Sequence, residues 1–176
     1  MKKSLILIMT LFFVSANLQS QLTKEEKKQQ KREIDEKEYL ATKELVNSSA
    51  FTFVALQTSP LGGPTVFLNT TPNYINIDGE QADIYLPYFG VVHAANGYNA
   101  EAGIKFNGKL ENYEIKFNDK KLQILLTFEI QRGHERHEFN FNIFKGATAS
   151  LVVASSRRNS ISYNGLISEL ELPLTN

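Results

Sequence analysis

Hydrophobic and polar residues alternate along most of the chain after residue 50, as they do in a β-strand with one buried face. The clearest segment places Gln123, Thr127 and Glu129 on one side. The other side is apolar and comprises Leu122, Ile124, Leu126, Phe128 and Ile130. Further alternating segments begin at Phe51, Tyr74, Ala82, Ile104, Tyr113, Phe139, Leu151, Ile161 and Leu166. The pattern predicts about eight to ten short strands.

Short turns are expected between these strands. Asp78-Gly79, Asn107-Gly108 and Asn164-Gly165 each stand between two alternating segments, and such pairs favour the tight turns of β-hairpins. No helical pattern separates the strands, so parallel connections are not expected. We predict that residues 50–174 form a mainly β domain, an antiparallel meander that closes as a barrel or folds into a two-layer sandwich.

Residues 21–49 differ in composition and predict one N-terminal α-helix. They contain no glycine or proline and are rich in Lys, Glu and Gln, which favour helix. Thr23 and Glu26 have the spacing of a capping box. The first half has almost nothing apolar to bury, so we expect it to project. The second half is expected to pack on the β domain through Leu40, Ala41, Leu45 and Val46.

The first 20 residues have the order of a secretory signal peptide. A pair of lysines precedes an uncharged apolar run over Ser4–Val14, and small residues follow. Cleavage is expected after Ala16 or after Ser20. The run has about 11 residues, fewer than the ~20 that a bilayer needs, and no later segment is long and apolar enough. We expect an exported protein without a transmembrane segment after cleavage, located in the periplasm, at the outer membrane or outside the cell.

Composition excludes several classes of site. The 176 residues include 19 basic and 19 acidic side chains and no cysteine. Without cysteine there is no disulfide scaffold, no thiolate zinc site, no cysteine nucleophile and no lipid-anchored N-terminus. A formal charge of zero argues against nucleic acid as the main partner. We predict no cofactor, no nucleic-acid partner and no lipoprotein.

The candidate ligand-binding residues come mostly from one aromatic-rich connection. Pro87 cannot donate a ladder hydrogen bond, so it is expected to end a strand and begin a connection that reaches Asn99. Aromatic residues on a loop of a β scaffold favour a ligand or partner surface. A compatible alternative is that Phe89 fills the barrel end while Tyr88 hydrogen-bonds the backbone. The candidates are Tyr85, Tyr88, Phe89, His93, Tyr98 and Arg157.

Two charged motifs have structural interpretations. The segment from Arg132 to Glu138 holds two histidines and two carboxylates, which are zinc-type ligands. Gly133 marks a hairpin tip and no third ligand is evident, so we interpret the segment as a charged turn and predict no metal.

Arg157 and Arg158 follow a strand and have the geometry to hold a carboxylate or phosphate. We expect ion pairs with strand carboxylates such as Glu169 or Glu171 instead. Neither Ser155 nor Ser162 lies in a Gly-x-Ser-x-Gly motif, so we predict a protein that is not an enzyme.

Several segments, taken in order, resemble a known family. They are Phe51-Thr52-Phe53, Leu86-Pro87-Tyr88-Phe89-Gly90, Gly103-Ile104-Lys105-Phe106, the run from Leu151 to Arg158, and Ile161-Ser162-Tyr163-Asn164-Gly165. As a set they resemble the domain-of-unknown-function family 4251, small exported proteins found mainly in Bacteroidetes. The resemblance covers most of the chain from Ala41 to Leu172. It implies an exported, β-rich bacterial domain of the periplasm or outer membrane, and it implies no activity.

These features predict an exported, non-catalytic binding protein whose aromatic side chains near Tyr85–Tyr98 take an apolar or amphipathic small ligand. Two alternatives stay open. A protein–protein interaction module of the cell envelope would show an exposed apolar patch or a free sheet edge. A hydrolase with an unrecognised site would show a convergent acid and base, around His93 or His134. The sequence does not indicate the oligomeric state.

Overall fold

The charged N-terminal segment forms a single helix, as the sequence predicts. The computed structural model describes residues 23–69, 72–89 and 103–170, and helix α2 spans Lys24–Asn47. Its first turn has the predicted capping box, because Thr23 N donates to Glu26 Oε2 at 2.6 Å and Glu26 N donates to Thr23 Oγ1 at 3.2 Å. The predicted signal peptide lies outside the described residues, as do His93 and Tyr98.

The second half of α2 packs through a different set of residues from the predicted one. Tyr39, Thr42 and Val46 are buried, whereas Leu40 and Ala41 are exposed. Leu45 is half-buried, so only Val46 of the predicted set is fully covered. Tyr39, Thr42 and Val46 are three and four residues apart and so share one face of the helix. Polar contacts hold this face against the β domain. Tyr39 Oη donates to Asp119 Oδ1 at 2.6 Å, and Thr42 Oγ1 accepts from Ala147 N at 3.1 Å.

The rest of the described chain is one antiparallel β-sheet. Its strands are β1 (Ala50–Pro60), β2 (Val66–Phe67), β3 (Tyr74–Asp78), β4 (Gln81–Pro87), β5 (Gly103–Lys109), β6 (Glu111–Asn118), β7 (Gln123–Arg132), β8 (Glu135–Phe144), β9 (Thr148–Ser155) and β10 (Ile161–Glu169). A 3₁₀ turn, η1 (Lys145–Ala147), lies between β8 and β9. The spatial order is β5-β4-β3-β1-β10-β9-β8-β7-β6, and β2 pairs with β1 beside this path.

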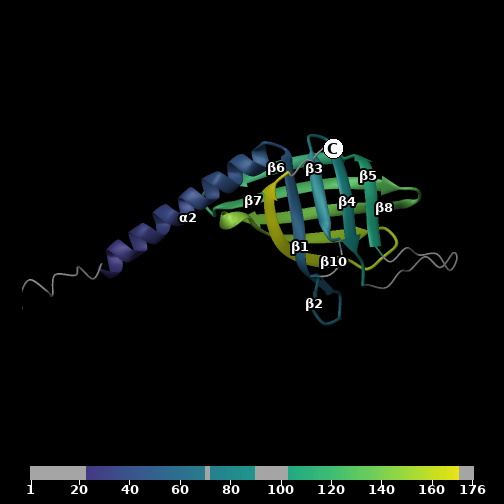
Figure 1. Cartoon of the computed structure of the whole chain (residues 1–176), viewed down its shortest axis with the longest axis horizontal. Helices are drawn as coiled ribbons and strands as arrows, with labels where there is room; N and C mark the ends of the chain where they lie inside the picture. Colours follow the sequence, from purple (N-terminus) through teal and green to yellow (C-terminus); the bar gives the residue numbers. More distant parts are fainter. Residues whose placement is uncertain (1–22, 70–71, 90–102, 171–176) are drawn as a thin grey trace, which may run out of the picture. The chain divides into compact units, whose positions relative to one another are not determined.

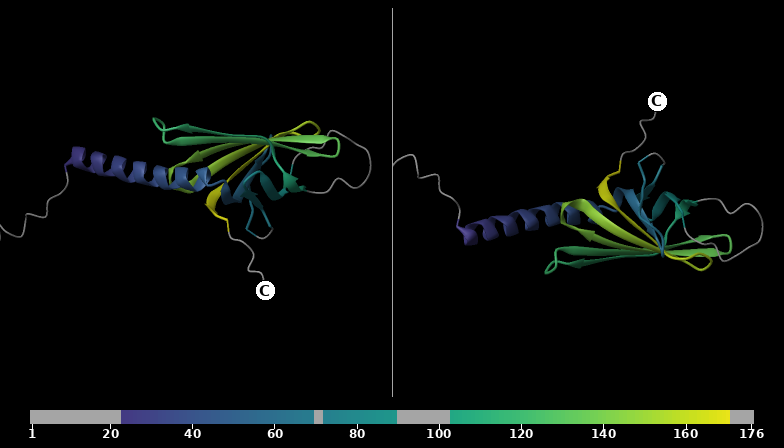
Figure 2. Two further views of the ribbon diagram at one scale, coloured as in Figure 1. Left: turned by 90° about the horizontal axis from the view of Figure 1, so that it is seen from above. Right: turned by 90° about the horizontal axis from the view of Figure 1, so that it is seen from below.

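This order makes the sheet nearly closed and barrel-like. Strands β5 and β6 are neighbours in the chain but lie at opposite edges of the sheet. The sheet bends so that β1, β3, β4 and β5 cross over β7 and β8 (Figure 1), and the two layers appear separately from above and below (Figure 2). The prediction of a mainly β antiparallel domain with an N-terminal helix is therefore confirmed, and of its two forms the barrel is the one observed.

The interior is filled by the inward side chains of alternate strand positions, as the period of two predicts. Phe53 and Phe141 meet edge to face with ring centroids 5.2 Å apart, and Phe128 stacks on Phe139 at 4.6 Å. All four are buried. Aromatic pairs of this kind add stabilisation beyond their buried area.

The three predicted turns are placed differently in the structure. Asp78 pairs with Gln81, so the two turn residues are Gly79 and Glu80, one position later than predicted. Asn107-Gly108 lies inside β5 and Asn164-Gly165 lies inside β10, so both predictions of a hairpin turn are wrong.

Close strand approach explains the glycine in β10. A Cβ atom on Gly165 would overlap the carbonyl oxygen of Val54 and would lie 2.8 Å from the Phe53 ring. The pairing of β1 with β10 also shifts register there, between Ala55 and Gln57. A glycine inside a strand is typical of such a bulge.

Candidate functional site

The predicted aromatic residues do not converge on one site. Tyr85 lies on the outward side of β4. Its ring stacks on that of Tyr74, with the ring centroids 6.3 Å apart, and Lys105 Nζ lies over it, 5.0 Å from the centroid. Tyr88 is buried, and its hydroxyl donates to the backbone carbonyl of Asn159 at 2.9 Å. The two tyrosines therefore do not line a common mouth.

Tyr88 shows the structural role that the sequence offered as the alternative, but Phe89 does not. Phe89 is 49% exposed, so the expectation that it fills the barrel end is wrong. Tyr88 occupies the inward position, and the extended backbone turns its neighbour outward. His93 and Tyr98 lie outside the described residues, and Arg157 is exposed on the segment after β9.

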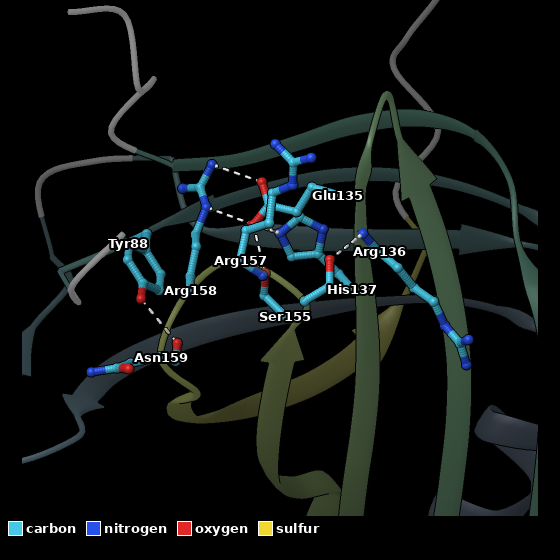
Figure 3. Close-up of polar contacts among 9 residues, drawn as sticks. Tyr88, Glu135, Arg136, His137, Ser155, Arg157, Arg158 and Asn159 are labelled. Carbon is cyan, nitrogen blue, oxygen red and sulfur yellow. Dashed lines mark hydrogen bonds and ion pairs between the residues drawn. The ribbon is translucent and has the colours of Figure 1, made fainter. Parts of the chain in front are cut away.

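A group of polar and charged side chains lies where β8 begins and β9 ends; His137 and Arg158 are buried, and Glu135 and Ser155 are half-buried. We call Glu135, His137, Ser155 and Arg158 the inner polar cluster (Figure 3). Arg158 donates to both carboxylate oxygens of Glu135, from Nε to Oε1 at 2.8 Å and from Nη2 to Oε2 at 3.2 Å. Ser155 Oγ donates to Oε1 at 2.6 Å. The Arg158 side chain also lies over the Tyr88 ring, 5.2 Å from its centroid, a cation–π geometry.

This pairing corrects the expected partner of the arginines. Arg158 pairs with Glu135, whereas Glu169 is exposed at the end of β10 and Glu171 lies outside the described residues. The β8–β9 register aligns His137 with Ser155 and so brings the start of β8 to the segment that follows β9. Gly133, at φ 58°, and His134 form the tip of the β7–β8 hairpin, as predicted, whereas the rest of the predicted charged turn, from Glu135 to Glu138, belongs to β8.

The charges of the cluster set the ionisation of Glu135. Burial alone would raise the pKa of this carboxyl, but the hydrogen bonds from Arg158 and Ser155 and the neighbouring positive charge outweigh it, so the pKa is lowered from its ordinary value of 4.5. Glu135 is a carboxylate at neutral pH. Burial raises the pKa of Tyr88 and of Tyr163, so both phenols stay neutral.

His137 is the unusual member of the cluster. Its side chain is 1% exposed, and neither ring nitrogen has a hydrogen-bond partner. Nε2 lies 3.3 Å from Glu135 Oε1, near enough for an electrostatic contact, but the pair does not meet hydrogen-bond geometry. Burial lowers the pKa of His137; Glu135 opposes this effect, and Arg158 and Arg132 add to it. The imidazole is therefore neutral at pH 7.

The cluster does not have the arrangement of a nucleophilic site. Ser155 Oγ donates to Glu135 and accepts from Arg157 N at 3.0 Å, so both of its hydrogen-bonding roles are taken by these groups. Across residues 23–69, 72–89 and 103–170, no group of three or more His, Asp or Glu side chains is placed to hold a metal ion. The absence of activity and of a cofactor stays a prediction.

A second feature lies on the outer surface of the sheet, where β1, β2, β9 and β10 meet. Here a groove of about 620 Å³, which we call the outer groove, is lined by Leu56, Gln57, Phe67, Phe144, Thr148, Ala149, Ser150, Asn164, Gly165 and Leu166. None of these residues is charged. Phe67 is 72% exposed and Leu56 is 50% exposed, values that are high for side chains of this size. The sequence analysis did not find this groove.

Comparison with known proteins assigns the chain to a family. Residues 33–167 match the family described as Domain of unknown function (DUF4251). The chain belongs to this family. The resemblance noted from the sequence is thus confirmed, over almost the same span.

A solved structure supports the DUF4251 fold. The crystal structure, at 1.95 Å resolution, of a DUF4251 family protein from Bacteroides eggerthii DSM 20697 matches with a TM-score of 0.60 at 17% sequence identity. The match covers 77% of this chain and 89% of that chain. At this identity the likeness shows the fold alone. No curated protein matches the sequence. Among the helices of the described residues, none has both the length and the apolar character needed to cross a bilayer.

Proposed function

We propose that the protein is an exported, non-catalytic binding protein that takes a small amphipathic ligand in the outer groove. The observation that carries this proposal is an uncharged, largely apolar hollow on the surface of a β-sheet whose interior is already packed. The ligand class is the one expected from the sequence. The site differs, because Tyr85 lies on the outward side of β4 whereas Tyr88, directly after β4, is buried.

The size of the groove fits a small molecule. Small-molecule sites commonly have volumes of roughly 300–1,000 Å³, and the outer groove has about 620 Å³. Its large apolar side chains, Leu56, Phe67, Phe144 and Leu166, are all substantially exposed. Clustered exposed hydrocarbon is typical of a site for a small ligand or for a partner protein, the alternative given above; the hollow shape and the volume of the groove favour the small ligand. A ligand with a hydrocarbon portion would remove this surface from water, which is the main source of its affinity.

The polar residues of the groove limit the other end of the ligand. Gln57, Ser150 and Asn164 supply amide and hydroxyl groups, and among the described residues no lysine, arginine or carboxylate lines the groove. A charged head group would lose hydration there without gaining a counter-ion. We therefore favour an uncharged polar head joined to a hydrocarbon chain.

The binding site is tested with Nile red, an uncharged apolar dye, and the purified chain from Gln21 to Asn176. We expect saturable binding with enhanced emission. In the double variant Phe67→Ser, Leu166→Gln, affinity should fall by about tenfold or more, because a buried side chain of this size contributes on the order of 1.5–3 kcal/mol.

Two control variants give this test its contrast. Leu125→Gln removes an exposed apolar residue of β7 that does not line the groove, so it should leave the affinity unchanged. Phe89→Ala tests the aromatic connection in the same way. Absence of binding by the unchanged chain, or an equal loss in Leu125→Gln and the double variant, would contradict the proposed site. Loss in Phe89→Ala alone would move the site to the connection after Pro87.

Export is tested separately. The full chain should appear in the exported fraction of a bacterial host and should be shorter at its N-terminus, whereas a chain starting at Gln21 should stay inside. The charged, apolar and small segments of residues 1–20 support this proposal. Retention of the full chain in the cytoplasm at its full length would contradict it.

A further inference from the structure

The buried His137 side chain makes no hydrogen bond that would explain why a histidine is there. Both ring nitrogens are fully covered and unpartnered. A buried polar group left in this state costs about 1–3 kcal/mol, and folded proteins contain few of them. Its strand neighbours on the same face, Phe139 and Phe141, are apolar. An apolar residue would pack there without that cost, so the imidazole needs another reason.

The surroundings of His137 contain charges of both signs. The charged and titratable groups of the neighbouring elements are Arg132 at the end of β7, Glu135 on β8, Arg158 after β9, Tyr88 after β4 and Tyr163 on β10. The two phenols are neutral; Glu135 supplies negative charge beside the ring, and Arg158 and Arg132 supply positive charge that also acts on it. A proton on His137 would add another positive charge to a site that is largely shielded from water.

Protonation would act on one particular contact. Glu135 Oε1 already accepts from Arg158 Nε at 2.8 Å and lies 3.3 Å from His137 Nε2. An imidazolium would attract this same oxygen and repel the guanidinium beside it. Arg158 stacks on Tyr88, and the Tyr88 hydroxyl bonds the carbonyl of Asn159. Loss of the ion pair would therefore leave the Arg158 side chain without the carboxylate that fixes it in the cluster.

We propose that His137 is a pH-sensitive switch: on acidification it takes up a proton and breaks the Arg158–Glu135 ion pair, which releases the Arg158 side chain from the cluster. Histidine is suited to this role because it titrates between about pH 5 and 8. Glu135 stays ionised through the upper part of this range, since its pKa lies below 4.5. The switch thus operates before the carboxylate itself is lost.

The two adjacent arginines provide the test. Arg157 is exposed and Arg158 is buried in the cluster, so the exchange of their Nε–H protons with water can be compared by NMR in the chain from Gln21 to Asn176. At about pH 7 the Arg158 proton should exchange much more slowly than that of Arg157. At a lower pH, at which the His137 ring signals show it to be protonated, this protection should fall by about tenfold, which reports a tenfold rise in the open population. The ratio cancels the direct effect of pH on the exchange chemistry.

Variants assign the effect to one side chain. His137→Gln, which stays neutral, should keep the protection ratio constant between the two pH values. His134→Gln, at the exposed tip of the β7–β8 hairpin, should behave as the unchanged chain. An unchanged ratio in the unaltered protein, or an equal fall in His137→Gln, would overturn the switch.

A measurement on the unaltered protein decides the matter if His137→Gln does not fold. The imidazole signals of His137 and the Arg158 protection ratio should change with the same midpoint, below pH 6.5 because the pKa of His137 is lowered from that value. If His137 titrates while Arg158 stays protected, the proposal is wrong. A fall in protection that occurs only as Glu135 is protonated would also contradict it.

Discussion

The inner polar cluster and the outer groove both depart from the usual distribution of side chains. The cluster covers charged groups, whereas the groove exposes apolar ones. In the cluster, Arg158 and Glu135 have side chains only 7% and 14% exposed. In the groove, Phe67 and Leu56 turn large apolar surfaces to water. A buried ion pair is weak evidence for stability, because desolvation offsets its attraction, and exposed hydrocarbon contributes nothing to folding. Both regions are therefore better explained by what the protein does than by how it folds.

Removing one partner of the buried ion pair should have the largest effect on stability. Arg158→Ala leaves Glu135 buried and unpaired, which should lower the free energy of unfolding by about 3 kcal/mol. Arg157→Ala, at the next position but exposed, should change it by less than about 0.5 kcal/mol. Urea denaturation followed by tyrosine fluorescence measures both. Equal changes in the two variants would mean that the buried ion pair contributes no more to stability than an exposed arginine does.

Replacing the glycine that lines the groove should have the next largest effect on stability. Gly165 lines the groove and meets Val54 and the Phe53 ring on its other side. Gly165→Ala forces β1 and β10 apart and should destabilise the protein by about 2 kcal/mol. Gly63→Ala is the matched control, since its new Cβ would make only ordinary contacts with Pro60. If thermal melting shows no difference between the two variants, the close approach of the strands is not required.

The cluster, unlike the groove, should make stability depend on pH. The pKa of His137 is lower in the folded protein than its ordinary value of 6.5, so below about pH 6.5 the unfolded chain binds more protons and stability falls. Glu135, whose pKa is lowered from 4.5, maintains its contribution above that value, which is then lost as pH drops through the folded pKa. Urea midpoints should therefore decrease from about pH 7 to pH 5.5, less steeply in His137→Gln. A midpoint that rises on acidification would refute the sign of this linkage.

The groove residues should have the smallest effect on folding. Phe67→Ser removes an aromatic ring that is mostly in water, so the free energy of unfolding should change by less than about 0.5 kcal/mol. The same variant should still weaken Nile red binding. A large loss of stability would show that Phe67 serves the fold rather than a ligand.

The sequence predicts the architecture well where one period repeats over many residues. The alternation in β7 and β8, and the capping box of α2, depend on near neighbours in the chain and are found as expected. The prediction of a turn at Asn164-Gly165 was wrong because it missed a contact with β1, a strand distant in the sequence. In the structure this dipeptide lies within β10, opposite the register shift in β1, where the two strands approach closely. The sequence alone does not show where β1 lies, so it does not distinguish this arrangement from a turn.

The candidate site could be predicted only in part. Continuing the alternation of Phe139 and Phe141 back along β8 places His137 on the inward face, so the buried histidine had a local signal that was missed. Its contact with Arg158 had none, because the two residues are joined through the β8–β9 pairing and the segment that follows. The outer groove draws its lining from β1, β2, β8, β9 and β10, which no local pattern links.

We propose that a small amphipathic molecule binds the outer groove rather than the interior or the aromatic connection. Chemical-shift mapping tests it most directly, with the ¹⁵N-labelled chain from Gln21 to Asn176 titrated with 1-decanol, an uncharged amphiphile. We expect saturable changes in the amide chemical shifts of Leu56, Phe67, Ser150 and Leu166, and no change at the amides around Tyr85 and His137. Shifts centred on Tyr85 or His137, or none at saturating 1-decanol, would contradict it.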